Sequence, residues 1–322
     1  MNVLISSAGK RVSLVKSFKN ELNKNFKEAK VIATDANPKL SAACQVADDF
    51  YKVPRVDAPD YIDLLLKICK DKEIKLIIPT IDTELAILAQ NRKMFIKAGC
   101  TPVISDPEFI AQCRDKRLIH QFFESQGVHF AKEYPKDDYE LPLFIKPSDG
   151  SRSADTFLVT QEQHMKERFF TEDRFMFLEY IAPDLYDEFT CDLYYDRNGN
   201  LKCAVPRKRI EVRDGEVNKG LTKRNILVSY IRERLAHVSG ARGCLTAQFF
   251  LEKNGNRVVG IEINPRFGGG YPLSYLARAN FPKWLIEEYL LSKDIQDQFD
   301  CWEDNLPMLR YDNEILVHDY NS

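Results

Sequence analysis

The chain has 322 residues, of which 44% are hydrophobic and 29% are charged, and its formal net charge is −2 at pH 7. This composition excludes a disordered or low-complexity chain, and the missing basic excess argues against a protein that binds nucleic acid by neutralising phosphates. The length exceeds one ordinary domain and predicts two or three.

The sequence carries no sign of targeting, of a membrane span or of a metal-binding cysteine framework. The apolar run at residues 3–5 is too short for a signal peptide, and no stretch approaches the roughly 20 apolar residues of a membrane span. None of the 8 cysteines forms a CxxC pair, which argues against zinc and disulfide frameworks. We therefore expect a cytoplasmic protein with reduced thiols and no membrane partner.

The first hundred residues alternate between short apolar strands and amphipathic helices. The predicted strands are residues 3–5, 31–33, 49–53, 76–78 and 102–104, and the predicted helices are residues 12–26, 61–69 and 85–95. This order predicts a parallel sheet that is covered on both faces. Since such sheets bind ligands at the carboxyl ends of their strands, residues 7–11, Asp35 and residues 80–84 are candidates to line a site. Within these segments, Asp82 and Glu84 are expected to face a cleft between domains.

The pattern changes after residue 105. Ser105, Asp106 and Pro107 begin a helix and are expected to form the hinge into a second domain, and residues 115–126 predict another helix. From about residue 143, strands are joined by hairpins at residues 194–199 and 251–257, which predicts an antiparallel sheet with flanking helices. The polar segment at residues 302–322 receives no assignment.

The strongest signal is the segment of residues 260–270. Side chains alternate along a strand, so Glu262, Asn264 and Arg266 share one face, and Pro265 marks the end of the strand. A carboxylate beside an amide oxygen offers hard ligands that suit magnesium. A neighbouring guanidinium can stabilise a transferring phosphoryl group. The alternative is the wet face of a half-exposed strand.

The preceding strand, residues 246–251, supplies a test of this site. A three-residue loop at the Asn254–Asn256 turn places Gln248 opposite Glu262 and on the same face, whereas a two-residue turn would pair Gln248 with Ile261. We predict the three-residue loop, or another loop that gives the same register.

Further segments suit a nucleotide, although each is also compatible with ordinary surface charge. Lys146 ends a short strand and precedes a Gly/Ser loop that includes Gly150 and Ser151. Lys116 lies at a helix N-terminus, where a cation is unfavourable unless an anion is near. The strand of residues 175–181 can offer its backbone to an adenine edge, and Glu188 can accept from ribose hydroxyls.

In this order, the segments resemble the ATP-grasp superfamily, most closely the single-copy enzymes related to the carbamoyl-phosphate synthetase large chain. The resemblance runs from about residue 2 to about residue 290 and rests on residues 115–116, 144–147, 178–181, 188–192, 248 and 262–266. It implies a Rossmann-like domain at residues 1–105 and an ATP-grasp domain at residues 106–322. Within the first of these, residues 78–85 are the part that most resembles the corresponding domain of the family. The small nucleotide-clamping lobe would span about residues 117–181 and the large metal-binding lobe about residues 182–300.

The resemblance also implies roles for individual residues. Lys116 and Lys146, with Gly150 and Ser151, would hold the ATP phosphates. Glu179, Tyr180 and Ile181 would form the adenine hinge, and Glu188 would bind the ribose. Gln248, Glu262 and Asn264 would hold one or two Mg²⁺ (or Mn²⁺) ions, with Arg266, Arg209 and Lys146 as catalytic groups. The sequence departs from the family at Arg152, Asp155 and Arg278, where glycine is expected.

The implied reaction is an ATP-dependent ligation of a small carboxylate to a small amine (or thiol) through an acyl-phosphate. In the basic run of residues 206–213, Arg207 and Arg209 share a strand face that suits capture of a carboxylate, or they protect a solvated edge. Dimers are common in the superfamily, which makes a homodimer an expectation. Two alternatives stay open: an inactive nucleotide-binding or regulatory module, and a bicarbonate-activating enzyme similar to carbamoyl-phosphate synthetase.

Overall fold

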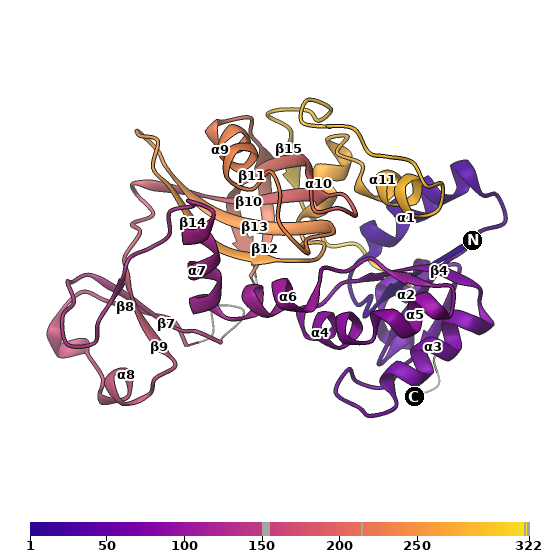
Figure 1. Cartoon of the computed structure of the whole chain (residues 1–322), viewed down its shortest axis with the longest axis horizontal. Helices are drawn as coiled ribbons and strands as arrows, with labels where there is room; N and C mark the ends of the chain where they lie inside the picture. The colour runs from indigo at the N-terminus through magenta and orange to yellow at the C-terminus, as the bar shows by residue number, and fades with distance from the viewer. Residues whose placement is uncertain (150–154, 214, 319, 321–322) are drawn as a thin grey trace.

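The computed structural model describes residues 1–149, 155–213, 215–318 and 320, and its strands form three sheets with flanking helices (Figure 1). The predictions for Gly150, Ser151 and Arg152 lie outside the described residues. Among the described residues, no helix is both long enough and apolar enough to cross a bilayer.

The first sheet is parallel, as predicted, and has the strand order β3-β2-β1-β4-β5. Its strands are β1 (Asn2–Ser6), β2 (Val31–Asp35), β3 (Asp49–Lys52), β4 (Ile74–Pro79) and β5 (Thr101–Pro102). Its α-helices are α1 (Val12–Asn25), α2 (Ala42–Val46), α3 (Tyr61–Asp71), α4 (Asp82–Gln90) and α5 (Arg92–Lys97), with a short 3-10 helix η1 (Pro38–Leu40). The predicted helix 85–95 is thus two helices. The order reverses between β1 and β4, and the loops after these two strands meet where the hydroxyl of Thr80 donates to the carbonyl of Ser7 at 2.6 Å.

Two helices follow the first sheet, α6 (Pro107–Arg114) and α7 (Lys116–Ser125). The carboxylate of Asp115 accepts hydrogen bonds from the backbone N–H groups of Arg117 and Leu118, so it caps α7 and fixes its start at Lys116. The predicted helix at residues 115–126 is confirmed.

The second sheet, called here the small sheet, is antiparallel with the order β6-β9-β7-β8. Its strands are β6 (Glu133–Tyr134), β7 (Leu143–Pro147), β8 (Phe157–Val159) and β9 (Phe175–Glu179), and it carries η2 (Glu162–His164) and α8 (Glu167–Thr171). It lies at one end of the molecule (Figure 1). Its core is separate and consists of Leu143, Ile145, Val159, Phe169, Phe175 and Phe177.

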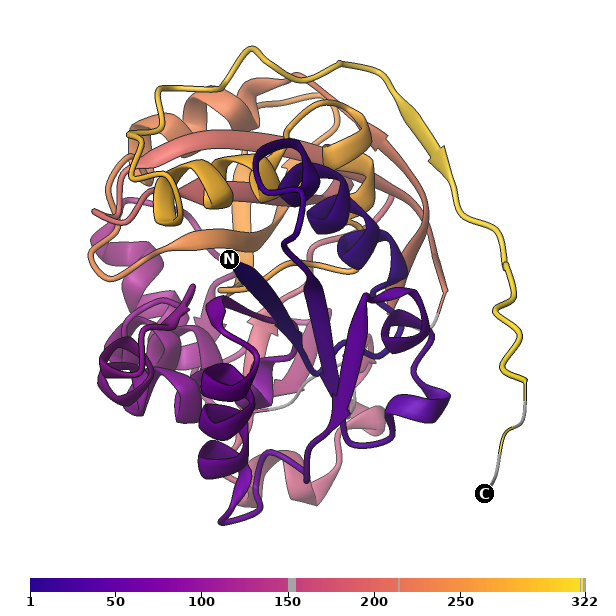
Figure 2. The same ribbon diagram turned by 90° about the vertical axis from the view of Figure 1, so that its right-hand side faces the viewer.

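The third sheet, called here the large sheet, is antiparallel with the order β14-β13-β10-β11-β12-β15. Its strands are β10 (Tyr186–Tyr195), β11 (Leu201–Arg213), β12 (Glu216–Thr222), β13 (Gly243–Glu252), β14 (Val258–Asn264) and β15 (Pro307–Leu309). Its helices are α9 (Ile226–Arg234), α10 (Tyr271–Leu276) and α11 (Phe281–Tyr289). Part of the unassigned C-terminal segment therefore adds a strand beside β12, and residues 311–318 run along the outside of the molecule (Figure 2).

One hydrophobic core joins the first sheet to the large sheet. It includes Val3 from the first sheet, Phe18 from helix α1, Phe249 from β13 and Phe267 from the turn after β14. The rings of Phe18 and Phe267 meet edge to face with centroids 6.0 Å apart. This shared core holds the switch point of the first sheet against the end of β14.

Candidate functional site

The centre of the candidate site is the strand pair β13–β14. Gln248 lies opposite Glu262, and Thr246 lies opposite Asn264. The Nε2 group of Gln248 donates to Oε1 of Glu262 at 2.9 Å, and the Nδ2 group of Asn264 donates to the same oxygen at 2.8 Å. The three predicted metal ligands therefore converge on one point.

The predicted register is confirmed, but a different loop produces it. The N–H of Glu252 donates to the carbonyl of Arg257 at 3.0 Å, which leaves residues 253–256 as a four-residue loop. Phe249 then pairs with Gly260 while Gln248 pairs with Glu262, so Ile261 is an extra residue on β14. This bulge restores the face that the four-residue loop would otherwise reverse. The structure therefore has the second form of the prediction, another loop with the same register for Gln248, in place of the three-residue loop.

Two lysines face this carboxylate from the small sheet and α7. The pKa of Lys146 is lowered to about 8, mainly by burial and also by the charge of Lys116, while Glu262 opposes the shift. Burial also lowers the pKa of Lys116, against the attraction of Glu262, and its Nζ donates to the carbonyl of Ser148 at 3.4 Å. Both cations are thus partly desolvated near Glu262. An anionic ligand bound beside them would offset the free-energy cost of this desolvation.

His120 belongs to the same surroundings and was not selected from the sequence. Burial, followed by the charges of Lys146 and Lys116, lowers its pKa to about 4, so the imidazole is neutral at pH 7. Its ring stacks on Phe130 with centroids 4.6 Å apart. The five histidines show no motif spacing, so no sequence signal marked this one.

On the large sheet, Arg209 links two predicted site residues. Its Nε lies 3.3 Å from Oε1 of Glu188, and its Nη1 donates to Oε1 of Gln248 at 3.5 Å. Burial raises the pKa of Glu188, the charge of Arg209 opposes this shift, and Glu262 adds to it. Arg209 thus connects the proposed ribose residue to the proposed metal ligands.

The proposed pairing of Arg207 with Arg209 in carboxylate capture is wrong. The side chain of Arg207 is 1% exposed and forms two contacts with Asp192, from Nε to Oδ2 at 2.7 Å and from Nη2 to Oδ1 at 3.0 Å. Because Asp192 is itself buried, separating the pair would leave an uncompensated charge inside the protein. Arg207 is therefore committed to the core.

Arg266 connects the large sheet to the first sheet. Its Nη2 donates to Oδ2 of Asp82 at 2.6 Å, and Asp82 begins α4 directly after the switch-point loop. The expectation that Glu84 also faces a cleft is wrong. Glu84 is 0% exposed and accepts a hydrogen bond from the hydroxyl of Tyr61, and burial raises its pKa.

The predicted adenine hinge lies at the end of β9. Both carboxylate oxygens of Glu179 are bound by the guanidinium of Arg257, at 2.7 Å each, and this pairing is the main reason that the pKa of Glu179 is lowered. The backbone N–H of Glu179 donates to the carbonyl of Lys132 at 2.8 Å. These two groups of Glu179 are thus engaged within the protein, and Arg257 ties the small sheet to the β13–β14 hairpin.

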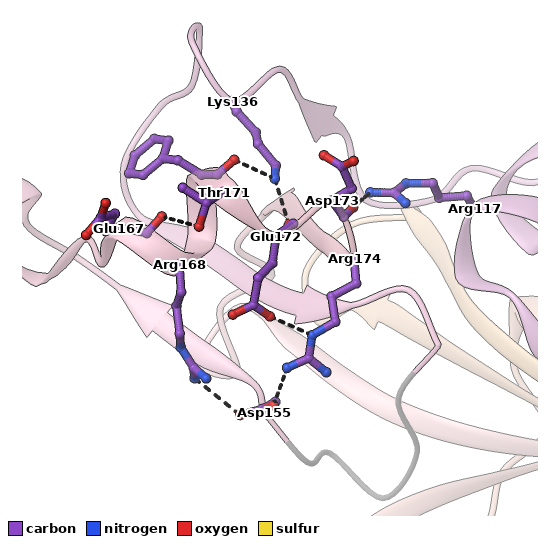
Figure 3. Close-up of polar contacts among 10 residues, drawn as sticks. Arg117, Lys136, Asp155, Glu167, Arg168, Thr171, Glu172, Asp173 and Arg174 are labelled. Atoms are coloured by element: carbon purple, nitrogen blue, oxygen red, sulfur yellow. Dashed lines mark hydrogen bonds and ion pairs between the residues drawn. The ribbon is translucent and has the colours of Figure 1, made fainter.

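Two of the residues that replace glycine have a left-handed backbone. Asp155 has a φ of 58° and Arg278 a φ of 82°, a conformation that glycine adopts more readily than other residues. Figure 3 shows the carboxylate of Asp155 between Arg168 at 3.2 Å and Arg174 at 2.8 Å, with Arg174 also bound to Glu172 at 2.9 Å. These ion pairs hold Asp155, the first described residue after residue 149.

Two family models match the sequence. One, described as "PylC-like, N-terminal domain", matches residues 3–104, and the other, described as "ATP-grasp in the biosynthetic pathway with Ter operon", matches residues 171–304. No curated protein matches the sequence.

Solved structures match nearly the whole chain at low identity. N5-carboxyaminoimidazole synthetase from Staphylococcus aureus, complexed with ADP, has a TM-score of 0.69 and 15% identity, and the match covers 95% of this chain and 80% of that one. The biotin carboxylase domain dimer of 2-oxoglutarate carboxylase from Hydrogenobacter thermophilus, with MgADP and bicarbonate, has a TM-score of 0.68 and 12% identity and covers 95% and 73%.

An L-amino acid ligase from Bacillus licheniformis is a third such structure. Its TM-score is 0.64 and its identity 14%, and the match covers 90% of this chain and 74% of that one. Identities this low establish the fold and leave the substrates open.

Proposed function

We propose that the chain, which has the ATP-grasp fold, is an ATP-dependent ligase that activates a small carboxylic acid as an acyl-phosphate and joins it to an amine. The observation that carries the proposal is the convergence of Gln248 and Asn264 on the Glu262 carboxylate, close to Lys116 and Lys146. This is a cationic and amide-rich surrounding for a triphosphate.

In this proposal, the small sheet and α7 bind the nucleotide. Lys116 and Lys146 contact its phosphates, since binding an anion offsets the cost of keeping two partly buried cations charged. The Glu179–Ile181 segment meets the adenine and Glu188 accepts from the ribose. Gly150 and Ser151 stay in the proposal as phosphate-loop residues, although they lie outside the described residues.

The ligand set of β13–β14 fits a hard divalent cation. In the present rotamers both amides direct an N–H toward Glu262, and a half-turn of each amide group directs its oxygen there instead. Glu262 is the one carboxylate of the three, so nucleotide phosphates must supply the remaining negative charge. We propose that Gln248, Glu262 and Asn264 hold Mg²⁺ or Mn²⁺, which when bound neutralises charge on the phosphates.

The reaction requires positioning and charge more than covalent help from the protein. An oxygen of the acid attacks the γ-phosphorus, the bond to the β–γ bridging oxygen breaks, and ADP leaves. The amine nitrogen then attacks the acyl carbon, the carbon–oxygen bond to phosphate breaks, and the nitrogen loses a proton. Arg266 and Arg209 would stabilise the negative charge on the transferring group.

The proposal includes the organisation of the molecule. We assign residues 1–105 to a Rossmann-like domain and residues 106–322 to the ATP-grasp domain, with the lobes at about residues 117–181 and 182–300. We also propose a cytoplasmic homodimer that acts on small molecules. The dimer is supported by its occurrence in the Hydrogenobacter biotin carboxylase structure.

The test is ADP release from MgATP with a panel of small carboxylates and amines. We expect release to require one acid, and Glu262→Gln to reduce it by about two orders of magnitude while the melting temperature is kept. Nucleotide binding without turnover on the whole panel would instead favour a regulatory module. Release stimulated by bicarbonate alone would favour a carbamoyl-phosphate-synthetase-like reaction.

A further inference from the structure

Three arginines from separate parts of the chain surround the turn after β14. Arg11 ends the loop after β1, Arg266 follows β14, and Arg310 follows β15. Their side chains are 20%, 15% and 31% exposed. Burial is the main cause that lowers the pKa of Arg11. The charge of Glu216 opposes this shift, and the charges of Arg266 and Arg310 add to it. The three guanidinium groups thus lie within one electrostatic cluster.

The cluster contains more cations than carboxylates. Oε2 of Glu216 lies 2.8 Å from Nη1 of Arg310, and Oε1 lies 3.9 Å from Nη1 of Arg11. Asp82 pairs with Arg266. In the part of the chain that the structure describes, three guanidinium groups therefore face two carboxylates, which leaves one positive charge in excess there.

Arg11 carries that excess. Among the described residues, its guanidinium donates no hydrogen bond within the protein, and its one ion-pair partner is Glu216, at 3.9 Å, which is too long for such a bond. An arginine that is largely buried without a close acceptor is costly unless a ligand provides one.

The backbone beside Arg266 is shaped to admit these side chains. The carbonyl of Gly269 accepts from Nη2 of Arg310 at 2.6 Å. A Cβ atom at Gly269 would lie 2.7 Å from Oε1 of Glu216 and 3.0 Å from Nη1 of Arg11, so a side chain at this position would displace the cluster.

We propose that Arg11 and Arg310 bind a second carboxylate of the acid substrate, beside the end that reacts near Arg266, so that the substrate is a dicarboxylic acid. The inference rests on the proposed ligase function. The Glu216 carboxylate, 48% exposed, holds the place of that group in the free protein and turns into solvent when the substrate enters. A guanidinium matches a carboxylate in a two-point contact, so the substrate carboxylate replaces Glu216 on Arg310 and gives Arg11 the close acceptor that it lacks in the free protein.

The experiment compares acids of matched length. ADP release from MgATP is measured with succinate, glutarate, adipate, aspartate and glutamate, and with butyrate, valerate and 3-phosphoglycerate. We expect release with a dicarboxylate and none with the monocarboxylates. In Arg11→Gln and Arg310→Gln, the KM for that acid rises about ten- to hundredfold and the KM for ATP is unchanged. Glu216→Gln lowers the KM for the acid.

A matched control is available on the neighbouring strand. Arg213 lies at the end of β11 and pairs with Asp312 at 3.4 Å, so Arg213→Gln removes the same charge from a contact with the same C-terminal segment. Its KM for the acid stays at the wild-type value. Arg11→Lys keeps the charge and guards against loss of the fold, and melting temperatures are compared for all variants.

The remaining outcomes separate this inference from the proposed function. Release with monocarboxylates that is insensitive to Arg11→Gln overturns the dicarboxylate site and leaves the ligase intact. Release with 3-phosphoglycerate alone assigns the cluster to phosphate and overturns the carboxylate assignment. If no acid supports ADP release, the melting temperature of the protein is measured with a non-hydrolysable ATP analogue, with and without each dicarboxylate. If no dicarboxylate raises this melting temperature, the inference is overturned. Failure to bind nucleotide would overturn the proposed function itself.

Discussion

At the scale of single residues, Lys146 shows how a partly buried ammonium group opposes folding. Its pKa of about 8 lies below the ordinary value of 10.5, so between these pH values the unfolded chain binds more protons than the folded one. Stability attributable to this residue therefore rises as pH rises from about 8 to 10.5, and below pH 8 the buried ammonium costs roughly 3 kcal/mol. A side chain kept at such a cost is expected to be needed for a ligand.

The pKa of Lys146 predicts how nucleotide affinity depends on pH. The ammonium form attracts phosphate, and it is lost in the free protein as pH rises through about 8. We expect the Kd for MgADP to be constant below about pH 7 and to rise toward tenfold per pH unit above pH 8, with proton uptake on binding at pH 8.5. Isothermal titration calorimetry in two buffers of different ionisation enthalpy measures both quantities.

Lys146→Arg supplies the control for this prediction, because a guanidinium stays charged over the whole range. Its Kd is expected to be flat to pH 9. A wild-type protein whose Kd is equally flat to pH 9 would show that Lys146 does not meet the phosphates.

Sequence patterns found those site residues whose geometry is local. Glu262 and Asn264 follow from strand alternation, and Gln248 from one hairpin. Arg11 was included only as the last residue of the candidate loop at residues 7–11, and Arg310 and His120 were not identified. The partners of these residues come from distant elements, and no spacing rule connects them. Arg207 was misassigned because alternation cannot tell a site-facing position from one that meets a buried partner such as Asp192.

At the scale of elements, the β13–β14 hairpin explains why a correct register can come from an incorrect loop. An extra loop residue and a bulge each shift the strand pairing by one residue. The sequence therefore determines the net register shift, and does not determine the loop length and the bulge separately. The apolar side chains of Phe249 and Ile263 must both reach the core, and this requirement selects the net register shift. The extra residue at Ile261 follows from the same requirement, and no local signal marks it.

The contact between β14 and α7 leads to a prediction at this scale. A Cβ atom on Gly260 would lie 2.8 Å from Cε2 of Phe123, and the N–H of Gly260 donates to the carbonyl of His129 at 2.7 Å. We expect Gly260→Ala to lower the free energy of unfolding by about 1–3 kcal/mol. The variant should also weaken MgADP binding, since the displaced helix carries Lys116.

A double variant tests the cause of these losses. Phe123→Leu shortens the side chain that a Cβ at residue 260 would meet. The double variant of Gly260→Ala and Phe123→Leu should therefore lose less unfolding free energy than the sum of the losses in the two single variants. Urea unfolding and calorimetry on the four proteins measure the coupling. Strictly additive losses would place the effect of Gly260→Ala elsewhere than in this contact.

At the scale of the whole molecule, the cores divide the protein differently from the order of segments in the chain. The face of the first sheet that carries α1 shares a core with the large sheet, although residues 107–181 lie between them in the sequence. The small sheet is built from that intervening part and keeps a core of its own. The change of pattern near residue 105 predicted two types of sheet, but it could not reveal that they share a core, because such packing has no sequence period.

This arrangement predicts two cooperative units, one formed by the first and large sheets and one by the small sheet. Both tryptophans, Trp284 and Trp302, belong to the shared core, so their fluorescence reports the first unit. Phe18→Ala, in the first sheet's helix α1, is expected to lower the free energy of unfolding seen by fluorescence by about 3–5 kcal/mol, because its ring fills that core. Phe169→Ala, in the small-sheet core, should leave the fluorescence transition in place and speed amide exchange in β7 and β9. If Phe18→Ala leaves the fluorescence transition unchanged, the first sheet unfolds separately from the large sheet. The ion pair between Asp82 and Arg266 would then join two independent folding units.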